Sequence, residues 1–240
     1  MADSIRLGLF NPPPYRNRHR IATELDTRGM AYHPFFRLDR FTLRPPKSRE
    51  EVELLASTER PLYDDVAWST EIISDWVERF AHGILMLFQD EKLIGGFGMW
   101  PLTADDLDAI AANSVEESAV RPVTLSQVLN QGGHQHWYIT GIFLLPDHRD
   151  HAARRSFSQL ICMALNNLAD SGLIRFPAQV CAVGYSREGQ RLLEHLGLQV
   201  DPAATTDWGR FYRHTMASRD QFFWPTIRQT GIDQLIEPLA

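Results

Sequence analysis

Three polar side chains that could take part in proton transfer lie at alternate positions of one apolar run. His136, Tyr138 and Thr140 belong to the stretch HWYITGIFLL, and a period of two places them on one face of a strand. An imidazole titrates near neutral pH, so His136 suits the role of a general base. Tyr138, acting directly or through a water molecule, is an alternative, and Tyr185 at the end of the next predicted strand is a third.

A second stretch could bind a phosphate. Residues 144–155, LLPDHRDHAARR, lead from the apolar run through Pro146 into a predicted helix. The first turn of a helix presents unpaired backbone N–H groups and the positive end of the macrodipole, which together suit a pyrophosphate. The side chains of Arg149, Arg154 and Arg155 add cationic donors beside it.

Apolar periodicity and breaker residues predict the elements that position these side chains. The run 136–145 is nearly all apolar, so we expect a central strand covered on both faces. The other expected strands are 35–43, 84–88, 93–100, 180–185 and 210–216, and the expected helices are 48–60, about 69–82, 103–112, 123–129, 152–171 and 186–196. This order predicts an α/β protein with a mixed, mostly antiparallel central sheet flanked by helices.

The strand-to-helix stretch resembles the GNAT acetyltransferase superfamily. Members commonly show V-x-P-x-x-R-x-x-G-x-G/A at this joint, and this chain has Leu144-x-Pro146-x-x-Arg149-x-x-Ala152-x-Arg154. The later segment from Tyr185-Ser186 to Leu198, which contains LLEHLGL, is similar to the family's helix ending in "lYeklGF". The resemblance covers about residues 35–216 and implies the GNAT-type acyl-CoA N-acyltransferase fold.

The resemblance also implies roles for individual residues. Backbone groups near Ile142, Phe143 and Leu144 would pair with the pantetheine arm of acyl-CoA, and Ser186 with the following helix would border the pantetheine and the acyl group. Tyr138 falls where the family often carries a base or a water-holding residue. The backbone N–H groups expected to hold the pyrophosphate are those of Arg149, Asp150, His151, Ala152, Ala153, Arg154 and Arg155.

Three positions depart from the family pattern. Ala152 and Arg154 stand where members have glycines, which let a ligand approach the backbone closely. Arg154 either obstructs the groove or turns outward and grips a phosphate. Leu193 stands where members often carry a general-acid tyrosine, so another donor or water must protonate the leaving thiolate.

The resemblance therefore implies an enzyme that moves an acetyl or other acyl group from acyl-CoA, as a substrate, to a primary amine. One alternative is an enzyme similar to acyl-homoserine-lactone or N-acyl-amino-acid synthases, which use a long acyl chain. Another is a non-catalytic binding or regulatory protein that keeps the fold.

The chain divides into a basic N-terminal extension (1–34), an acyltransferase domain (35–216) and a C-terminal tail (217–240). Residues 102–133 are expected to form an insertion within the domain. We interpret its acidic side chains as a solvated helix face, and attraction of a cationic amine is the alternative. These side chains are Asp105, Asp106, Asp108, Glu116 and Glu117.

Composition narrows the class of protein further. A net charge of −6 does not favour a nucleic-acid partner, and no run reaches the length of a membrane span. The only cysteines, Cys162 and Cys181, lie in apolar surroundings, and we expect buried reduced thiols and a cytoplasmic protein. No metal is expected, because the histidines near 134–151 lack matched carboxylate or cysteine spacing. A homodimer remains open.

Overall fold

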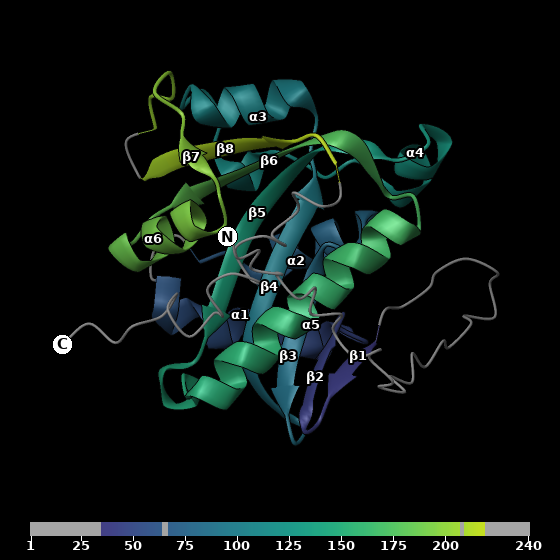
Figure 1. Cartoon of the computed structure of the whole chain (residues 1–240), viewed down its shortest axis with the longest axis vertical. Helices are drawn as coiled ribbons and strands as arrows, with labels where there is room; N and C mark the ends of the chain where they lie inside the picture. Colours follow the sequence, from purple (N-terminus) through teal and green to yellow (C-terminus); the bar gives the residue numbers. More distant parts are fainter. Residues whose placement is uncertain (1–34, 64–66, 207–208, 219–240) are drawn as a thin grey trace, which may run out of the picture.

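A computed structural model describes residues 35–63, 67–206 and 209–218 of the chain. The predicted extension 1–34 and nearly all of the tail 217–240 lie outside these residues. The described part contains one sheet of eight strands in the order β1-β2-β3-β4-β5-β6-β8-β7. All neighbouring strands are antiparallel except β5 and β6, which are parallel. The predicted mixed, mostly antiparallel sheet is therefore confirmed (Figure 1).

The strands are β1 (Phe36–Leu38), β2 (Phe41–Arg44), β3 (Ile84–Gln89), β4 (Lys92–Pro101), β5 (His134–Leu144), β6 (Ile174–Gly184), β7 (Gln199–Val200) and β8 (Arg210–Met216). The α-helices are α1 (Arg49–Tyr63), α2 (Thr70–Arg79), α3 (Ala104–Ala111), α4 (Leu125–Asn130), α5 (His151–Asp170) and α6 (Arg187–His195). The described ranges also contain two single 3₁₀ turns, η2 (Glu117–Ala119) and η3 (Pro146–His148).

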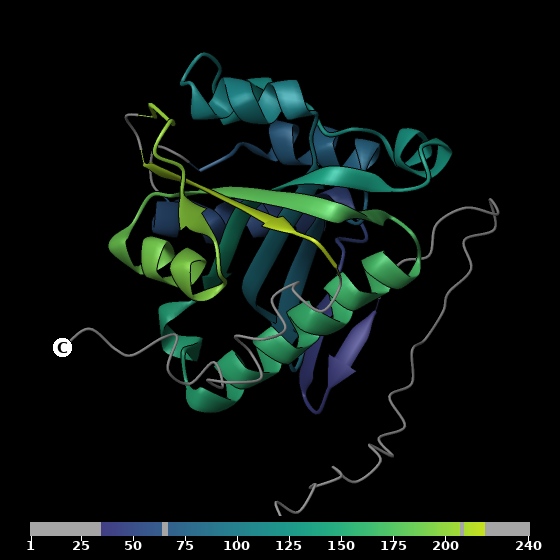
Figure 2. The ribbon, with the colours of Figure 1, turned by 45° about the horizontal axis from the view of Figure 1, so that its top comes forward.

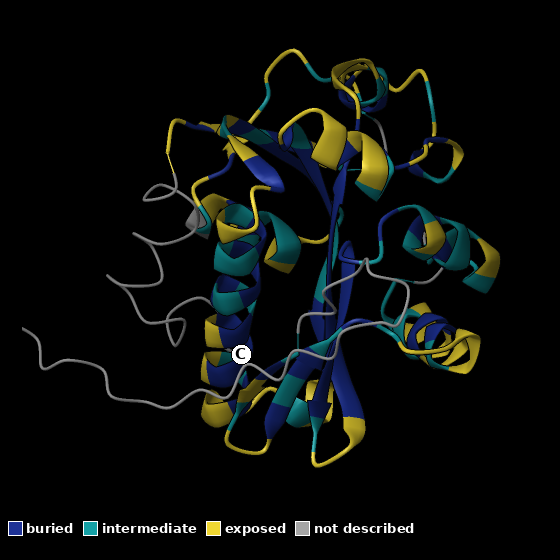
Figure 3. Ribbon diagram, turned by 90° about the vertical axis from the view of Figure 1, so that its right-hand side faces the viewer, coloured by how far each residue is buried: buried dark blue, intermediate teal, exposed yellow. Residues whose placement is uncertain are grey.

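Helices cover both faces of the sheet. Helix α5 lies across one face, and α1 and α2 lie on the other (Figure 3). The segment between β4 and β5, which carries α3 and α4, lies at the end of the sheet away from the start of α5 (Figure 2). The strands are buried and the outer sides of the helices are exposed, which makes the sheet the centre of the core (Figure 3).

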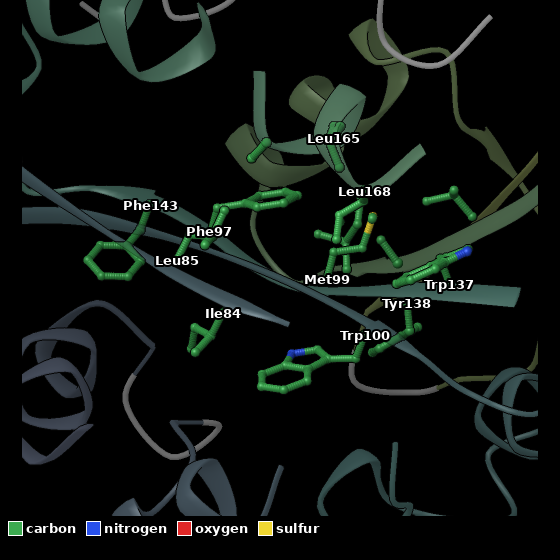
Figure 4. Packing of buried hydrophobic residues seen from close by; sticks show 14 of the residues in the cluster. Ile84, Leu85, Phe97, Met99, Trp100, Trp137, Tyr138, Phe143, Leu165 and Leu168 are labelled. Carbon is green, nitrogen blue, oxygen red and sulfur yellow. The ribbon is translucent and has the colours of Figure 1, made fainter. Parts of the chain in front are cut away.

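The core differs in composition on the two faces. Leu165 and Leu168 of α5 pack over one face, whereas Ile84, Trp100 and Tyr138 lie on the other (Figure 4). Trp100 and Tyr138 are fully buried. The face beneath α1 and α2 therefore combines apolar bulk with indole and phenol groups that can hydrogen-bond.

Several sequence predictions are confirmed almost residue for residue. The run 136–145 forms β5 in the middle of the sheet, and the last strand has the predicted bounds. Ser69 and Ser186 cap α2 and α6, and Thr103 forms a capping box on α3. These features depend on residues within one helical turn, which a sequence pattern captures well.

Three predictions need correction. The single strand 35–43 is a hairpin of β1 and β2, because Asp39 has a positive φ of 52° that reverses the chain. Helix α1 continues past Arg60 through Pro61, since a proline near a helix end removes only one backbone hydrogen bond. Strand β6 begins at Ile174, before Pro177, rather than at Val180, and its pairing with β5 is irregular over that stretch.

Among the described residues, no helix is both long enough and apolar enough to cross a membrane.

Candidate active site

A bulge in β5 shapes the candidate site. The pairing of β4 with β5 shifts register so that Gly98 faces Gly141 and Met99 faces Ile139, which leaves Thr140 as the extra residue. Regular alternation would send adjacent side chains to opposite faces, but the bulge lets Thr140 and Gly141 line one cavity together. The glycine in β4 is needed here, because a Cβ on Gly98 would come within 2.4 Å of the Thr140 hydroxyl oxygen.

Strands β5 and β6 separate beyond this bulge. Their parallel pairing ends at Ile139 and Ala182, although β5 continues to Leu144. Because the Leu145 N–H bonds to Ile94 of β4, alternation turns the backbone groups of Ile142 and Leu144 toward the β6 side. The expected pantetheine-binding edge thus has two residues with suitably directed groups, and the backbone of Phe143 faces β4 instead.

Side chains of the protein itself occupy this edge. The Arg149 Nε donates to the Leu144 carbonyl oxygen at 3.0 Å. The Tyr63 hydroxyl accepts a hydrogen bond from the Ile142 N–H, and its ring packs edge-on against Phe143 with centroids 6.3 Å apart. A ligand that pairs with β5 would have to replace the Tyr63 hydroxyl at Ile142.

A cavity of about 40 Å³ lies beside the bulge, on the face covered by α1 and α2. Its lining combines carboxyl, hydroxyl and aromatic groups and contains no lysine, arginine or histidine. The lining residues in the described chain are Glu59, Tyr63, Ala67, Trp68, Ile73, Ile84, Gly98, Trp100, Glu117, Thr140, Gly141 and Tyr185.

Glu117 is the most unusual residue of this cavity. Its side chain is only 6% exposed, and it accepts a hydrogen bond from the Tyr138 hydroxyl. Burial raises the pKa of Glu117 to about 7, although hydrogen bonds from Tyr138 and Tyr185 oppose the shift. A carboxyl group that titrates near neutral pH can accept a proton at working pH, which is what a general base must do.

The interpretation of the acidic insertion as a solvated face is wrong for Glu117. Asp105, Asp108 and Glu116 are exposed, but η2 folds Glu117 inward. The Arg121 guanidinium lies 2.6 Å from the carboxylate of Asp75 in α2 and ties the segment to the domain. Buried apolar residues also anchor the insertion, namely Leu107, Ile110, Val120, Val123 and Val128.

A second carboxyl group, Glu59 of α1, lines the same cavity. Burial raises the pKa of Glu59 to about 7, and no other group contributes to that shift. The pKa of Tyr63, one turn further along α1, is raised above its ordinary value by burial and by the nearby Glu59. Both groups are therefore protonated more readily than their exposed counterparts.

The predicted catalytic residues divide into two groups. Tyr138 and Tyr185 both meet at Glu117, and burial raises the pKa of each phenol. His136 does not line the cavity, and burial lowers its pKa while Asp108 outside the cavity acts in the opposite direction. The geometry therefore disfavours His136 as the base at this cavity.

The predicted phosphate site at the start of α5 is only partly open. The Asp150 carboxylate caps the helix and accepts from the Ala153 N–H at 2.8 Å. The Arg149 N–H donates to the Pro146 carbonyl oxygen at 3.3 Å, and the Arg154 N–H donates to the Asp150 carbonyl oxygen at 3.1 Å, so these three expected donors are already engaged. His151, Ala152 and Arg155 are exposed. The exposed Arg155 side chain and the first turn of α5 form the part of this site that faces an incoming anion.

Ser186, which precedes α6, and Leu193, within α6, both have structural roles. The Ser186 hydroxyl caps the helix and accepts from the Gly189 N–H at 3.0 Å. Leu193, at the position of the family's tyrosine, is 5% exposed and belongs to the core. Protonation of a leaving thiolate would need a group from elsewhere, and Tyr63 and Tyr185 are the phenols in the described lining of the cavity.

The histidines near β5 do not form a metal site. His134 Nε2 lies 2.7 Å from the Leu102 carbonyl oxygen, whereas His148 lies against Gln89 and Lys92. Within the described ranges, no group of three or more histidine, cysteine or acidic side chains could hold a metal ion.

Sequence reasoning missed Glu59, Tyr63 and Glu117. Glu59 and Tyr63 share one side of α1 by their spacing of four, but nothing local shows that this side faces a cavity. Glu117 lies 21 residues before Tyr138, so no helical or strand period relates the two. The apolar residues of the insertion were the one feature of the sequence that could have indicated that this segment packs against the domain.

Comparisons with known proteins bear on the fold. No protein-family profile and no curated protein matches the sequence. The loading GNATL domain of CurA from Lyngbya majuscula is 16% identical, with 73% of this chain and 97% of that chain covered and a TM-score of 0.50. Ard1 from Thermoplasma volcanium is 11% identical, with 75% and 99% covered and a TM-score of 0.49. FeeM, an N-acyl amino acid synthase from uncultured soil microbes, is 14% identical, with 82% and 97% covered and a TM-score of 0.49. The similarity to the CurA domain and the strand order agree with the sequence motifs, and the chain has the GNAT fold in a divergent form.

Proposed function

We propose that this protein is an N-acyltransferase that moves an acyl group from acyl-CoA to a primary amine. The observation that carries the proposal is the buried Glu117 carboxyl, with a pKa of about 7, in a cavity beside the bulge of β5. The GNAT fold supplies the context, and the Ile142 N–H, on the edge of β5 that leaves β6, supplies a backbone donor for a thioester once the Tyr63 hydroxyl is displaced.

In the proposed reaction, the Glu117 carboxylate takes a proton from the ammonium group of the acceptor. The free amine nitrogen then attacks the thioester carbon, and the carbon–sulfur bond breaks to release the thiolate. The thioester oxygen takes the place of the Tyr63 hydroxyl at the Ile142 N–H, where the developing negative charge is stabilised. The attacking nitrogen then loses a second proton. Tyr185 or Tyr63 passes this proton on to the thiolate sulfur, which leaves as the CoA thiol.

The start of α5 is where the pyrophosphate of acyl-CoA would bind in this proposal, and it presents one obstacle. The side chains of Arg149, Arg154 and Arg155 and the first turn of α5 suit a pyrophosphate. Asp150 is the obstacle, because its carboxylate already caps the Ala153 N–H. A bound phosphate would have to displace Asp150 or use the neighbouring donors.

The first test is calorimetric titration with acetyl-CoA and, in parallel, with a longer acyl-CoA. Binding should weaken in Arg149→Ala, and Arg191→Ala on the exposed side of α6 is the matched control. Thiol release in the presence of primary amines then measures transfer, which should be lost in Glu117→Gln. Binding without any thiol release across an amine screen would contradict the proposal.

A second candidate is a non-catalytic binding protein that keeps the GNAT fold. The contact of Asp150 with Ala153 favours it, because this carboxylate competes with a phosphate for the helix start. Absence of binding by either acyl-CoA, together with recovery of binding in Asp150→Asn, would support this candidate.

A further inference from the structure

We propose that the acceptor is a small aliphatic diamine, and that Glu59 binds the ammonium group that does not react. This inference rests on the proposed acyltransferase function and assigns a substrate class to its cavity. Glu117 and Glu59 would have different roles. Glu117 would take the proton of the reacting nitrogen, and Glu59 would bind the ammonium group at the other end of the diamine.

The charge of the cavity is the first argument. Two carboxyl groups line it, and no cationic side chain among the described residues does. Glu117 is buried and Glu59 is half-buried, so charging both without a counter-ion is unfavourable, and a dication would relieve that cost. A neutral or anionic acceptor would leave that cost in place.

The lack of an internal partner for Glu59 in the described chain is the second argument. No hydrogen bond or ion pair involves its carboxyl group in the described part of the chain, whereas Glu117 receives hydrogen bonds from two tyrosines. Most buried polar groups have partners, so a desolvated carboxyl group that lines a cavity without one is suited to a ligand. The raised pKa of Glu59 is consistent with a carboxyl group that is removed from water and has no hydrogen-bond donor beside it among the described residues.

The aromatic part of the cavity lining is the third argument. The rings of Trp68 and Trp100 line the cavity and are fixed against Trp76, with centroids 4.4 and 5.2 Å from it. The Trp100 indole N–H also donates to the Thr140 hydroxyl at 3.0 Å. Indole faces attract cations and pack well against methylene groups. A lining that combines two carboxyl groups with indole faces suits an alkyl chain that carries an ammonium group at each end.

The binding test uses diaminobutane and pentylamine, which have similar size but differ by one charge. Calorimetry should show that wild-type protein binds diaminobutane at least about tenfold more tightly, and Glu59→Gln should remove that preference. Glu53→Gln, an exposed change on the same helix, is the matched control and should keep it. Equal affinity of wild type for the two amines, or a preference that survives in Glu59→Gln, would overturn the inference.

Turnover separates this inference from the proposed function. In Glu59→Gln the preference for diaminobutane over pentylamine in kcat/KM should be lost, whereas Glu117→Gln should abolish transfer to both amines. If wild type transfers acyl groups to pentylamine as readily as to diaminobutane, the function stands and the diamine inference fails. If diaminobutane binds through Glu59 but no amine is ever acylated, the proposed function fails instead.

Discussion

Replacement of Glu117 by glutamine should make the protein more stable at alkaline pH while it abolishes activity. The folded state holds the Glu117 proton up to a pKa of about 7, whereas the unfolded chain loses it near the ordinary value of 4.5. A raised carboxyl pKa therefore means that the free energy of unfolding is highest below the ordinary value, falls as pH rises toward the folded value, and stays lower above it. Glutamine has no proton to lose and keeps a carbonyl oxygen that can accept from Tyr138.

The magnitude follows from the two pKa values. Each pKa unit corresponds to about 1.4 kcal/mol, so ionisation of Glu117 costs the folded state up to about 3 kcal/mol at alkaline pH. Wild type and Glu117→Gln should then be similar in stability at about pH 4, and the variant should be more stable by up to about 3 kcal/mol at about pH 8. For a chain of this size the difference corresponds to roughly 6–12 °C in Tm.

Urea unfolding at the two pH values, with Tm as a second readout, measures the effect. Glu116→Gln is the matched control, because the neighbouring side chain is exposed and its removal should change stability by less than about 0.5 kcal/mol. A difference between wild type and Glu117→Gln that does not change with pH would refute the reasoning, since it would show that the folded state does not perturb this carboxyl group.

Three further predictions follow from the structure. Tyr138→Phe removes a hydrogen bond that lowers the pKa of Glu117, so the alkaline rise of the pH–rate profile should move to higher pH. Gly95→Ala should cost about 1–3 kcal/mol in urea unfolding, because the new Cβ would come within 2.6 Å of a backbone carbonyl oxygen of β5. Burial raises the pKa of Cys162 and Cys181 to about 12, so neither thiol should react with an aromatic disulfide reagent near neutral pH until the protein is denatured. Rapid reaction of the folded protein would contradict the last of these.

Much of the fold was predictable because its signals are local. The apolar run of β5, the serine caps of α2 and α6 and the positive φ of Gly197 at 85° after α6 each depend on a few adjacent residues. Such features act through backbone preferences and periodicity, which the sequence alone displays.

The candidate site was only half predictable. Tyr138 and Tyr185 were identified from their places on two strands, and both meet at one carboxyl group. That carboxyl group, Glu117, was assigned to a solvated face, and His136 was favoured for its intrinsic pKa although it lies outside the cavity.

The sequence by itself determined which segments are strands and helices and where most of them begin and end. Only the tertiary structure decided which acidic side chain becomes a candidate base. The ionisation of Glu117 depends on its removal from water and on hydroxyl groups brought from β5 and β6. Desolvation is a property of everything that surrounds a side chain, and no pattern within one segment of the chain encodes it.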